Sequence, residues 1–189
     1  MKKIMGVVGS PRWDGNTHIL VSRLLEGAEQ AGAKTDLLFL SGLTIRECDW
    51  CHACWKGGHC LKNDDMVDVY PRVAASDVIV FGTPIYWYGP TALMKAFLDR
   101  FVYFNAPENR RKIAGHGAVL AIPFEENTPE TAALTVAMFE KSFKYLQMNL
   151  LGKLIVPGVG ERGDILAKTE LLQEAYELGK RLAGGQAAI

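Results

Sequence analysis

The sequence lacks an excess of charge of either sign. It holds 21 Lys and Arg residues against 21 Asp and Glu residues, which gives a formal net charge of zero. Nucleic-acid-binding surfaces need a basic excess to release counterions, so this balance argues against a nucleic-acid partner. It also argues against a strongly acidic carrier protein that is steered to basic partners.

The sequence also lacks long apolar runs, and its cysteines are confined to one short segment. No run approaches the roughly 18 to 20 residues that span a bilayer, so no membrane partner is expected. The apolar run after Lys3 is shorter than the roughly 7 to 15 residues of an export signal, so a cytoplasmic protein is expected. All four cysteines lie between Cys48 and Cys60. Clustered cysteines in a cytoplasmic protein favour metal or redox chemistry over a disulfide scaffold.

Short apolar runs alternate with longer amphipathic stretches along the chain. Buried strands are predicted over residues 3–9, 34–40, 77–82, 117–123 and 153–157. Helices are predicted over residues 17–32, 66–75, 90–102, 129–148 and 165–183, the last with Asp164 as its N-cap. The segment from about 41 to 64 is expected to be irregular, and 184–189 to be a loose tail.

These strands are apolar throughout, which is typical of a parallel sheet that is covered on both faces. Five of them alternating with helices predict a doubly wound α/β fold. We expect a single domain over residues 1–189, with a cysteine-rich loop at about 45–62. The ligand site of such a fold lies at the carboxyl ends of the strands. The unusual loops at 10–16, 83–89 and 123–128 each follow a predicted strand and would share that edge.

The loop at residues 9–17 follows a strand and opens a helix, which points several backbone N–H groups and the positive helix end at one place. It lacks both G-x-G-x-x-G and the P-loop lysine, which excludes the two common nucleotide motifs. Gly15 is expected to supply a backbone conformation that other residues resist. The alternative is a plain polar turn in which Asn16 or Thr17 caps the helix. The candidate phosphate-binding residues are Ser10, Arg12, Gly15, Asn16 and Thr17.

The loop at residues 83–90 offers flat apolar surface of the kind that an aromatic cofactor ring needs. The alternative, which is compatible with the first, is a packing or dimer surface built from its consecutive aromatics. The candidate cofactor-binding residues here are Pro84, Ile85, Tyr86, Trp87 and Gly89. The loop after the fourth strand is less informative, and its Glu125 and Glu126 are expected to be solvated.

The cysteines follow the pattern C-x2-C-x2-C-x5-C, with Cys48, Cys51, Cys54 and Cys60 as candidate metal ligands. Four thiolates in one short loop can hold a single cubane or a tetrahedral metal ion. The pattern approximates a bacterial ferredoxin run, although the last cysteine is displaced and Leu61 replaces the proline. Zinc usually pairs two C-x2-C units across a longer spacer. An iron–sulfur cluster, free or partly oxidised thiols, and zinc stay open as alternatives. His52 and His59 are expected to be solvated.

Residues 10–17 resemble the Ser-Pro-Arg-x-x-Gly-Asn-Thr signature of the NADPH-dependent FMN reductase and iron–sulfur flavoprotein group. Residues 63–66, 82–87 and 95–100 match further parts of these proteins in the same order. The resemblance implies a flavodoxin-like fold with strand order 2-1-3-4-5 and helices on both faces. It also implies FMN, with its phosphate on Ser10, Arg12, Asn16 and Thr17, and a [4Fe-4S] cluster on the cysteines. Relatives form dimers or tetramers, so a homodimer or homotetramer is expected.

The leading functional prediction is an FMN-dependent oxidoreductase that passes electrons from NAD(P)H through FMN to a small-molecule or protein acceptor. Hydride transfer needs no protein acid or base, so no catalytic residue is named. One alternative is an electron carrier in which a [4Fe-4S] cluster on the cysteine loop feeds FMN. The other is a flavin-binding redox sensor without turnover.

Overall fold

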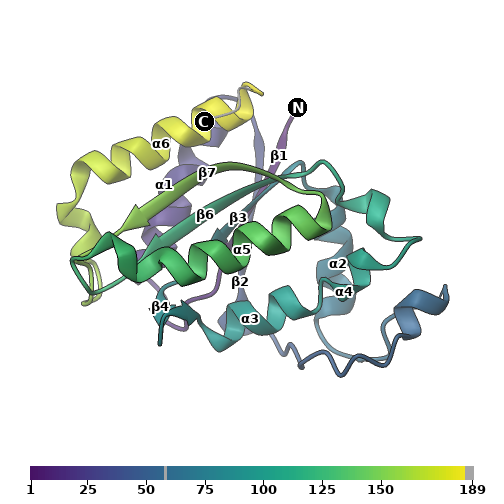
Figure 1. Cartoon of the computed structure of the whole chain (residues 1–189). Helices are drawn as coiled ribbons and strands as arrows, with labels where there is room; N and C mark the ends of the chain where they lie inside the picture. Colours follow the sequence, from purple (N-terminus) through teal and green to yellow (C-terminus); the bar gives the residue numbers. More distant parts are fainter. Residues whose placement is uncertain (58, 186–189) are drawn as a thin grey trace.

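The structure is a computed structural model that describes residues 1–57 and 59–185 (Figure 1). Five parallel strands form the central sheet in the order β2-β1-β3-β6-β7. These strands are β1 (Lys3–Val8), β2 (Lys34–Phe39), β3 (Val78–Gly82), β6 (Gly117–Pro123) and β7 (Asn149–Val156). When only the five strands of this sheet are numbered, β6 and β7 become the fourth and fifth, and the order is the predicted 2-1-3-4-5. The doubly wound α/β fold is confirmed. The tail expected at 184–189 falls outside the described residues from 186 onward.

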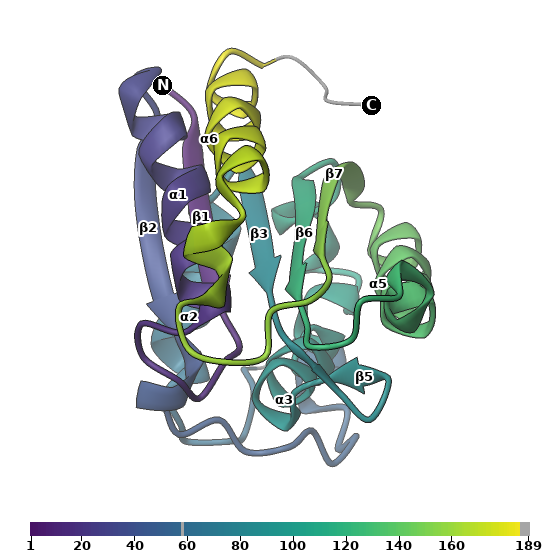
Figure 2. The same ribbon diagram turned by 90° about the vertical axis from the view of Figure 1, so that its left-hand side faces the viewer.

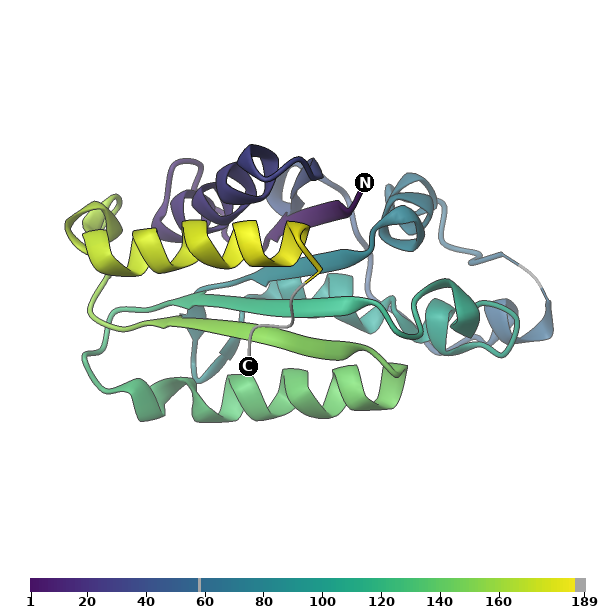
Figure 3. The ribbon, with the colours of Figure 1, turned by 90° about the horizontal axis from the view of Figure 1, so that it is seen from above.

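Helices cover both faces of the sheet, as Figure 3 shows from above. On one face lie α1 (Asn16–Gln30) and α6 (Thr169–Ala183). On the other face lie α2 (Met66–Ala75), α3 (Ala92–Asp99), α4 (Val102–Asn105) and α5 (Ala133–Leu146). Single-turn 3₁₀ helices are η1 (Leu40–Gly42), η2 (Ala53–Lys56), η3 (Arg110–Lys112), η4 (Pro129–Ala132) and η5 (Asp164–Ala167).

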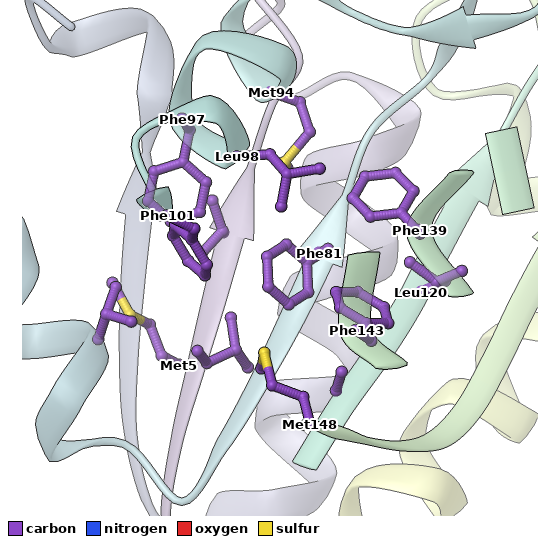
Figure 4. Close-up of a cluster of buried hydrophobic side chains, with 14 of the residues drawn as sticks. Met5, Phe81, Met94, Phe97, Leu98, Phe101, Leu120, Phe139, Phe143 and Met148 are labelled. Carbon is purple, nitrogen blue, oxygen red and sulfur yellow. The ribbon is translucent and has the colours of Figure 1, made fainter. Parts of the chain in front are cut away.

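The larger core lies between the sheet and the helices α2 to α5, and it contains a cluster of packed phenylalanine rings. In Figure 4, Phe81 of β3 faces Phe143 of α5, and their ring centroids are 4.9 Å apart. Phe97 and Phe101 pack beside them at 5.0 Å in an edge-to-face arrangement, which aromatic pairs favour. This packing anchors α3 on the sheet and thereby holds the chain segments at both ends of that helix.

Several predicted boundaries differ from the structure, and the helix predicted at 129–148 is the turn η4 followed by α5. The helix predicted at 90–102 begins only at Ala92, because the Thr91 hydroxyl accepts the Met94 N–H at 3.2 Å and acts as the N-cap. It ends at Asp99, and α4 follows as a separate turn. β7 begins at Asn149 instead of residue 153, since its pairing with β6 continues through a register shift between Ala118 and Val119.

The N-cap role predicted for Asp164 is wrong. Its carboxylate accepts the backbone N–H groups of Gly160 at 3.1 Å and Glu161 at 2.7 Å, so it closes the loop that follows β7. The last helix, α6, begins at Thr169 after the separate turn η5. The segment predicted at 165–183 is therefore two elements.

The carboxyl ends of the sheet strands meet at one edge. In Figure 2 the arrowheads of β2, β3 and β6 point to the lower end of the molecule. The register brings Val8 of β1 beside Phe39 and Gly82 there, and Pro123 beside Val156. None of the helices in the described part of the chain combines the length and apolarity that crossing a bilayer requires.

Candidate functional site

A cleft opens at this edge between four loops, which follow β1, β3, β6 and β7. Its lining includes all five candidates of the first loop and three of the second, whereas Trp87 and Gly89 are not among the lining residues. The complete lining is Ser10, Arg12, Gly15, Asn16, Thr17, Pro84, Ile85, Tyr86, Pro123, Phe124, Glu125, Val159, Gly160 and Arg162. The loop after β7 contributes residues that sequence analysis did not single out.

The first loop presents the N-terminus of α1 to this cleft. Gly15 is the N-cap residue, no side chain caps the helix, and its first turn holds no acidic residue. The alternative in which Asn16 or Thr17 caps the helix is therefore wrong. The positive end of the helix and its first N–H groups border the cleft, which is the arrangement that binds anions.

Gly15 does not have the special backbone conformation that was predicted for it. Its φ of −77° and ψ of 169° are extended backbone that any residue adopts. The left-handed residue of the loop is Asp14, with φ 55°. A side chain at position 15 would instead meet Arg12, whose Cβ and carbonyl oxygen lie 3.0 and 3.1 Å from the place of the added Cβ. The glycine thus allows the loop to fold tightly on itself.

The Asn16 side chain joins the first loop to the loop after β7. Its Nδ2 donates to the carbonyls of Val159 at 3.2 Å and Glu161 at 2.8 Å. Its Oδ1 accepts the N–H groups of Gly163 at 3.1 Å and Ile165 at 3.2 Å. Both the nitrogen and the oxygen of the amide therefore have protein partners, so this side chain holds the two loops of the cleft together. The backbone N–H of Asn16 belongs to the first turn of α1.

Two guanidinium groups line the cleft. Arg12 is exposed, and its Nη1 donates to the Gly160 carbonyl at 3.1 Å, while its backbone N–H bonds to the Ser10 hydroxyl at 3.1 Å. Arg162 comes from the loop after β7. No motif marks Arg162 in the sequence, although its place after the fifth parallel strand puts it at the same edge. Ser10 and Thr17 are buried in the described structure, at 4% and 2% exposure.

The second loop forms a small hairpin of β4 (Ile85–Tyr86) and β5 (Gly89–Pro90). Its two turn residues, Trp87 and Tyr88, have φ values of 51° and 61°. Trp87 is 97% exposed at the tip. Pro84, Ile85 and Tyr86 at the base of the hairpin line the cleft, so the apolar surface offered to it comes from the base and not from the tip.

Two buried threonines fix the hairpin against the first loop. The Thr91 hydroxyl donates to the Gly9 carbonyl, and the Thr91 N–H donates to the Thr83 hydroxyl at 3.1 Å. The Thr135 hydroxyl on α5 also donates to the Tyr88 carbonyl at 2.8 Å. Buried hydrogen bonds therefore fix the position of the second loop relative to the first loop.

The four cysteines line a small second cavity, to which α4 contributes Val102 and Tyr103. Arg100, Lys62 and Tyr70 line it as well. All four thiols are free. Burial raises the pKa of the Cys54 thiol, and the charges of the neighbouring Cys60, Cys48 and Cys51 raise it further. His52 and His59 are exposed, as expected. Gly57 has a φ of 74°, and Gly58 lies outside the described residues.

The chemistry of this donor set suits an iron–sulfur group. Such groups are held by cysteine thiolates, and four cysteines line one cavity here. The guanidinium of Arg100 and the ammonium of Lys62 offer positive charge to balance the thiolates. Among residues 1–57 and 59–185, no three His, Cys, Asp or Glu side chains converge as the ligands of a single metal ion do.

Comparison with known proteins gives a family match and a fold match. Residues 2–156 match the family described as NADPH-dependent FMN reductase. An iron–sulfur flavoprotein of Archaeoglobus fulgidus is 30% identical over 183 residues, which cover 96% of this chain and 79% of the relative. Alignments with two other archaeal iron–sulfur flavoproteins span about half of each relative.

Among solved structures, the Trp repressor binding protein of Bacillus subtilis superposes with a TM-score of 0.72 at 23% identity, over 94% of this chain and 98% of that one. The flavodoxin, WrbA-like protein of Agrobacterium tumefaciens gives a TM-score of 0.65 at 20% identity, over 97% and 96%. At these identities the likeness shows the fold, which is flavodoxin-like.

Proposed function

We propose that this chain, which belongs to the NADPH-dependent FMN reductase family, is an FMN-dependent oxidoreductase. It moves electrons from NAD(P)H to a second acceptor. The observation that carries the proposal is the cleft at the carboxyl edge. It combines an uncapped helix N-terminus, two guanidinium groups and an apolar wall. A phosphate needs the first two features, and a flavin ring needs the third.

In this proposal the residues of the cleft bind and orient the cofactor. The N–H groups at the start of α1, with Ser10, Arg12 and Thr17, hold the phosphate. Pro84, Ile85 and Tyr86 lie along the ring and exclude water from it. Bound FMN supplies the redox chemistry, since it accepts a hydride and passes electrons on. Asn16 fixes the loop after β7 and so completes the cleft around the cofactor.

The test starts with anaerobically purified protein loaded with FMN. We expect one FMN per chain, and oxidation of NADH or NADPH when a quinone or ferricyanide is present as acceptor. FMN bound at this stoichiometry with negligible turnover against quinone, ferricyanide and oxygen would contradict the reductase and support a redox sensor. Protein that binds no FMN would contradict the assignment of the cleft itself.

A second function is favoured by the cysteine cavity. We propose that Cys48, Cys51, Cys54 and Cys60 hold a [4Fe-4S] cluster that exchanges electrons with FMN, because the four free thiols line one cavity. Anaerobic reconstitution, followed by iron and sulfide analysis and a visible spectrum, tests this. Stoichiometric iron together with no NAD(P)H oxidation would favour an electron carrier over a reductase.

We also propose that the chain forms a homodimer or homotetramer through the exposed aromatics of the hairpin. Trp87 and its neighbours Tyr86 and Tyr88 are exposed large side chains, which interfaces favour. Light scattering of wild type and of a Trp87→Ser variant tests this. A monomeric wild type, or an unchanged oligomer in the variant, contradicts the use of this surface.

A further inference from the structure

Arg100, directly after α3, is a buried arginine in the described structure. The residue is 2% exposed, and the carboxylate of Asp64, to which its Nη1 donates, belongs to a side chain that is only 1% exposed. Charged side chains are rarely buried unless they are paired, because burial removes them from water. Burial by itself raises the pKa of Asp64. The hydrogen bond and the charge of Arg100, together with the backbone N–H groups of Arg46 and Met66, outweigh burial and lower that pKa, so the pair is ionic.

This ion pair joins the two ends of the cysteine-rich loop. Arg100 Nη1 also donates to the Arg46 carbonyl at 2.9 Å, and the Arg46 N–H donates to Asp64 at 3.0 Å. Arg46 precedes the first cysteine, and Asp64 follows the last. Next to them, the Thr44 N–H donates to the Asp65 carboxylate at 2.6 Å. Both ends of the loop are therefore tied to one guanidinium, whose own helix is packed on the sheet.

The guanidinium also reaches into the cysteine cavity. Arg100 Nη2 lies 3.1 Å from the Cys60 sulfur and donates to it. Lys62, which lines the same cavity, pairs instead with the Asp49 carboxylate at 2.8 Å. Of these two cations, Arg100 is thus the one that the described contacts place on a sulfur.

We propose that Arg100 is the positioning residue of the cysteine site: it fixes Cys60 in the cavity and, through its N–H bond to the sulfur, raises the reduction potential of an iron–sulfur group held there. This inference rests on the second function proposed above. A hydrogen bond and a positive charge at a ligand sulfur stabilise the reduced, more negative form of such a group, which raises its potential. Asp64 and the Arg46 carbonyl hold the guanidinium in the orientation that makes this bond.

The test compares two substitutions that each exchange one basic side chain for the other. Arg100→Lys keeps the charge, but an ammonium lacks the forked geometry that reaches Asp64, Arg46 and Cys60 together. Lys62→Arg is the matched control, because it keeps a charge in the cavity and touches no sulfur contact. We expect equal FMN content in wild type and both variants. We also expect a more negative midpoint potential of the reconstituted cluster in Arg100→Lys alone, measured by an anaerobic redox titration followed by electron paramagnetic resonance.

The outcomes separate the two proposals. Equal cluster potentials in wild type and Arg100→Lys overturn the role of Arg100 and leave the iron–sulfur function standing. A wild type that takes up no iron and sulfide overturns the iron–sulfur function and the role of Arg100 with it, whereas FMN binding is scored independently. If Arg100→Lys does not fold, the double variant Asp64→Asn with Arg100→Gln is titrated instead. That variant leaves no unpaired buried charge and also lacks the charged bond to Cys60, so the same shift is expected.

Discussion

The Asn16 side-chain amide donates a 2.8 Å hydrogen bond to the carbonyl of Glu161, across 145 positions of the chain. With its three other bonds to residues after β7, this makes Asn16 a link between the two sides of the cleft. We predict that Asn16→Ala lowers the stability of the FMN-free protein by about 2 kcal/mol, because backbone groups of the loop lose their partners. It should also weaken FMN binding about tenfold or more. Urea unfolding and fluorescence titration measure the two effects.

A variant of Arg12 tests whether a cleft residue contacts the FMN phosphate directly, as opposed to holding the cleft in shape. Its side chain is exposed and makes a single bond within the described structure, to the Gly160 carbonyl. We predict that Arg12→Ala weakens FMN binding about tenfold through loss of a charge-assisted bond to the phosphate, with little change in the stability of the FMN-free protein. Riboflavin, which has no phosphate, should bind both proteins alike. Arg111→Ala, an exposed arginine outside the cleft lining, is the control. Equal losses for FMN and riboflavin would contradict a phosphate contact.

The pairing of α1 with α6 depends on two glycines. A Cβ on Gly27 would lie 1.9 Å from the Tyr176 carbonyl oxygen, and one on Gly179 would lie 1.9 Å from that of Leu24. Backbone atoms cannot move aside as flexible side chains do. We therefore predict that either glycine-to-alanine substitution costs about 3 kcal/mol by forcing the helices apart. Gly42→Ala, where a Cβ meets nothing within 4 Å, should be nearly neutral. Thermal unfolding of the three variants checks this, and a neutral Gly27→Ala would disprove the close approach.

The fold could be predicted because its signals are local. The strand β6 and the helix α2 match their predicted ranges to the residue, since an apolar run and a helical apolar spacing mark them directly. The hairpin of β4 and β5 could not be predicted. Its turn residues Trp87 and Tyr88 both have positive φ, yet the Asn-Gly pair that usually marks such a turn is missing. Pro90 consequently looked like the start of a helix.

The candidate site was only half predictable, because part of it depends on partners that are distant in sequence. The first loop has a motif, whereas the loop after β7 has none, and it joins the cleft through the bonds of Asn16. Arg100 lies in a stretch that supported the family resemblance, but its bonds to Asp64 and Cys60 span 36 and 40 positions. Periodicity and spacing do not show such contacts.

His116 gives a prediction about pH. Burial lowers its pKa below the ordinary 6.5, the charge of Asp77 opposes this, and that of Lys2 adds to it. Its Nδ1 is buried, and no partner for it is present among the described residues. The unfolded chain therefore binds a proton at this residue more readily than the folded one, so stability falls as the pH drops below about 6.5.

Urea unfolding of FMN-free protein at pH 7.5 and pH 5.5 measures this loss. We predict that His116→Leu loses less stability between the two pH values than wild type does. His59→Gln, at an exposed histidine, is expected to match wild type. Identical losses in wild type and His116→Leu would show that this histidine does not couple folding to pH.

The two residues at the hairpin tip are predicted to affect stability through backbone strain but to leave FMN binding unchanged. Trp87 and Tyr88 have left-handed φ values, which are energetically costly for large side chains, whereas Asn and Gly adopt them readily. We predict that the isolated protomer of the double variant Trp87→Asn with Tyr88→Gly is as stable as the wild-type protomer or more stable by about 0.5–1 kcal/mol, although the variant loses the proposed oligomer contact. It should bind FMN with unchanged affinity, because neither side chain lines the cleft. Tyr86→Ala, at a residue that does line it, is the matched variant and should weaken FMN binding. If the tip variant lost FMN and Tyr86→Ala did not, the ring would lie against the tip of the hairpin, and the apolar wall of the cleft would have to be redrawn.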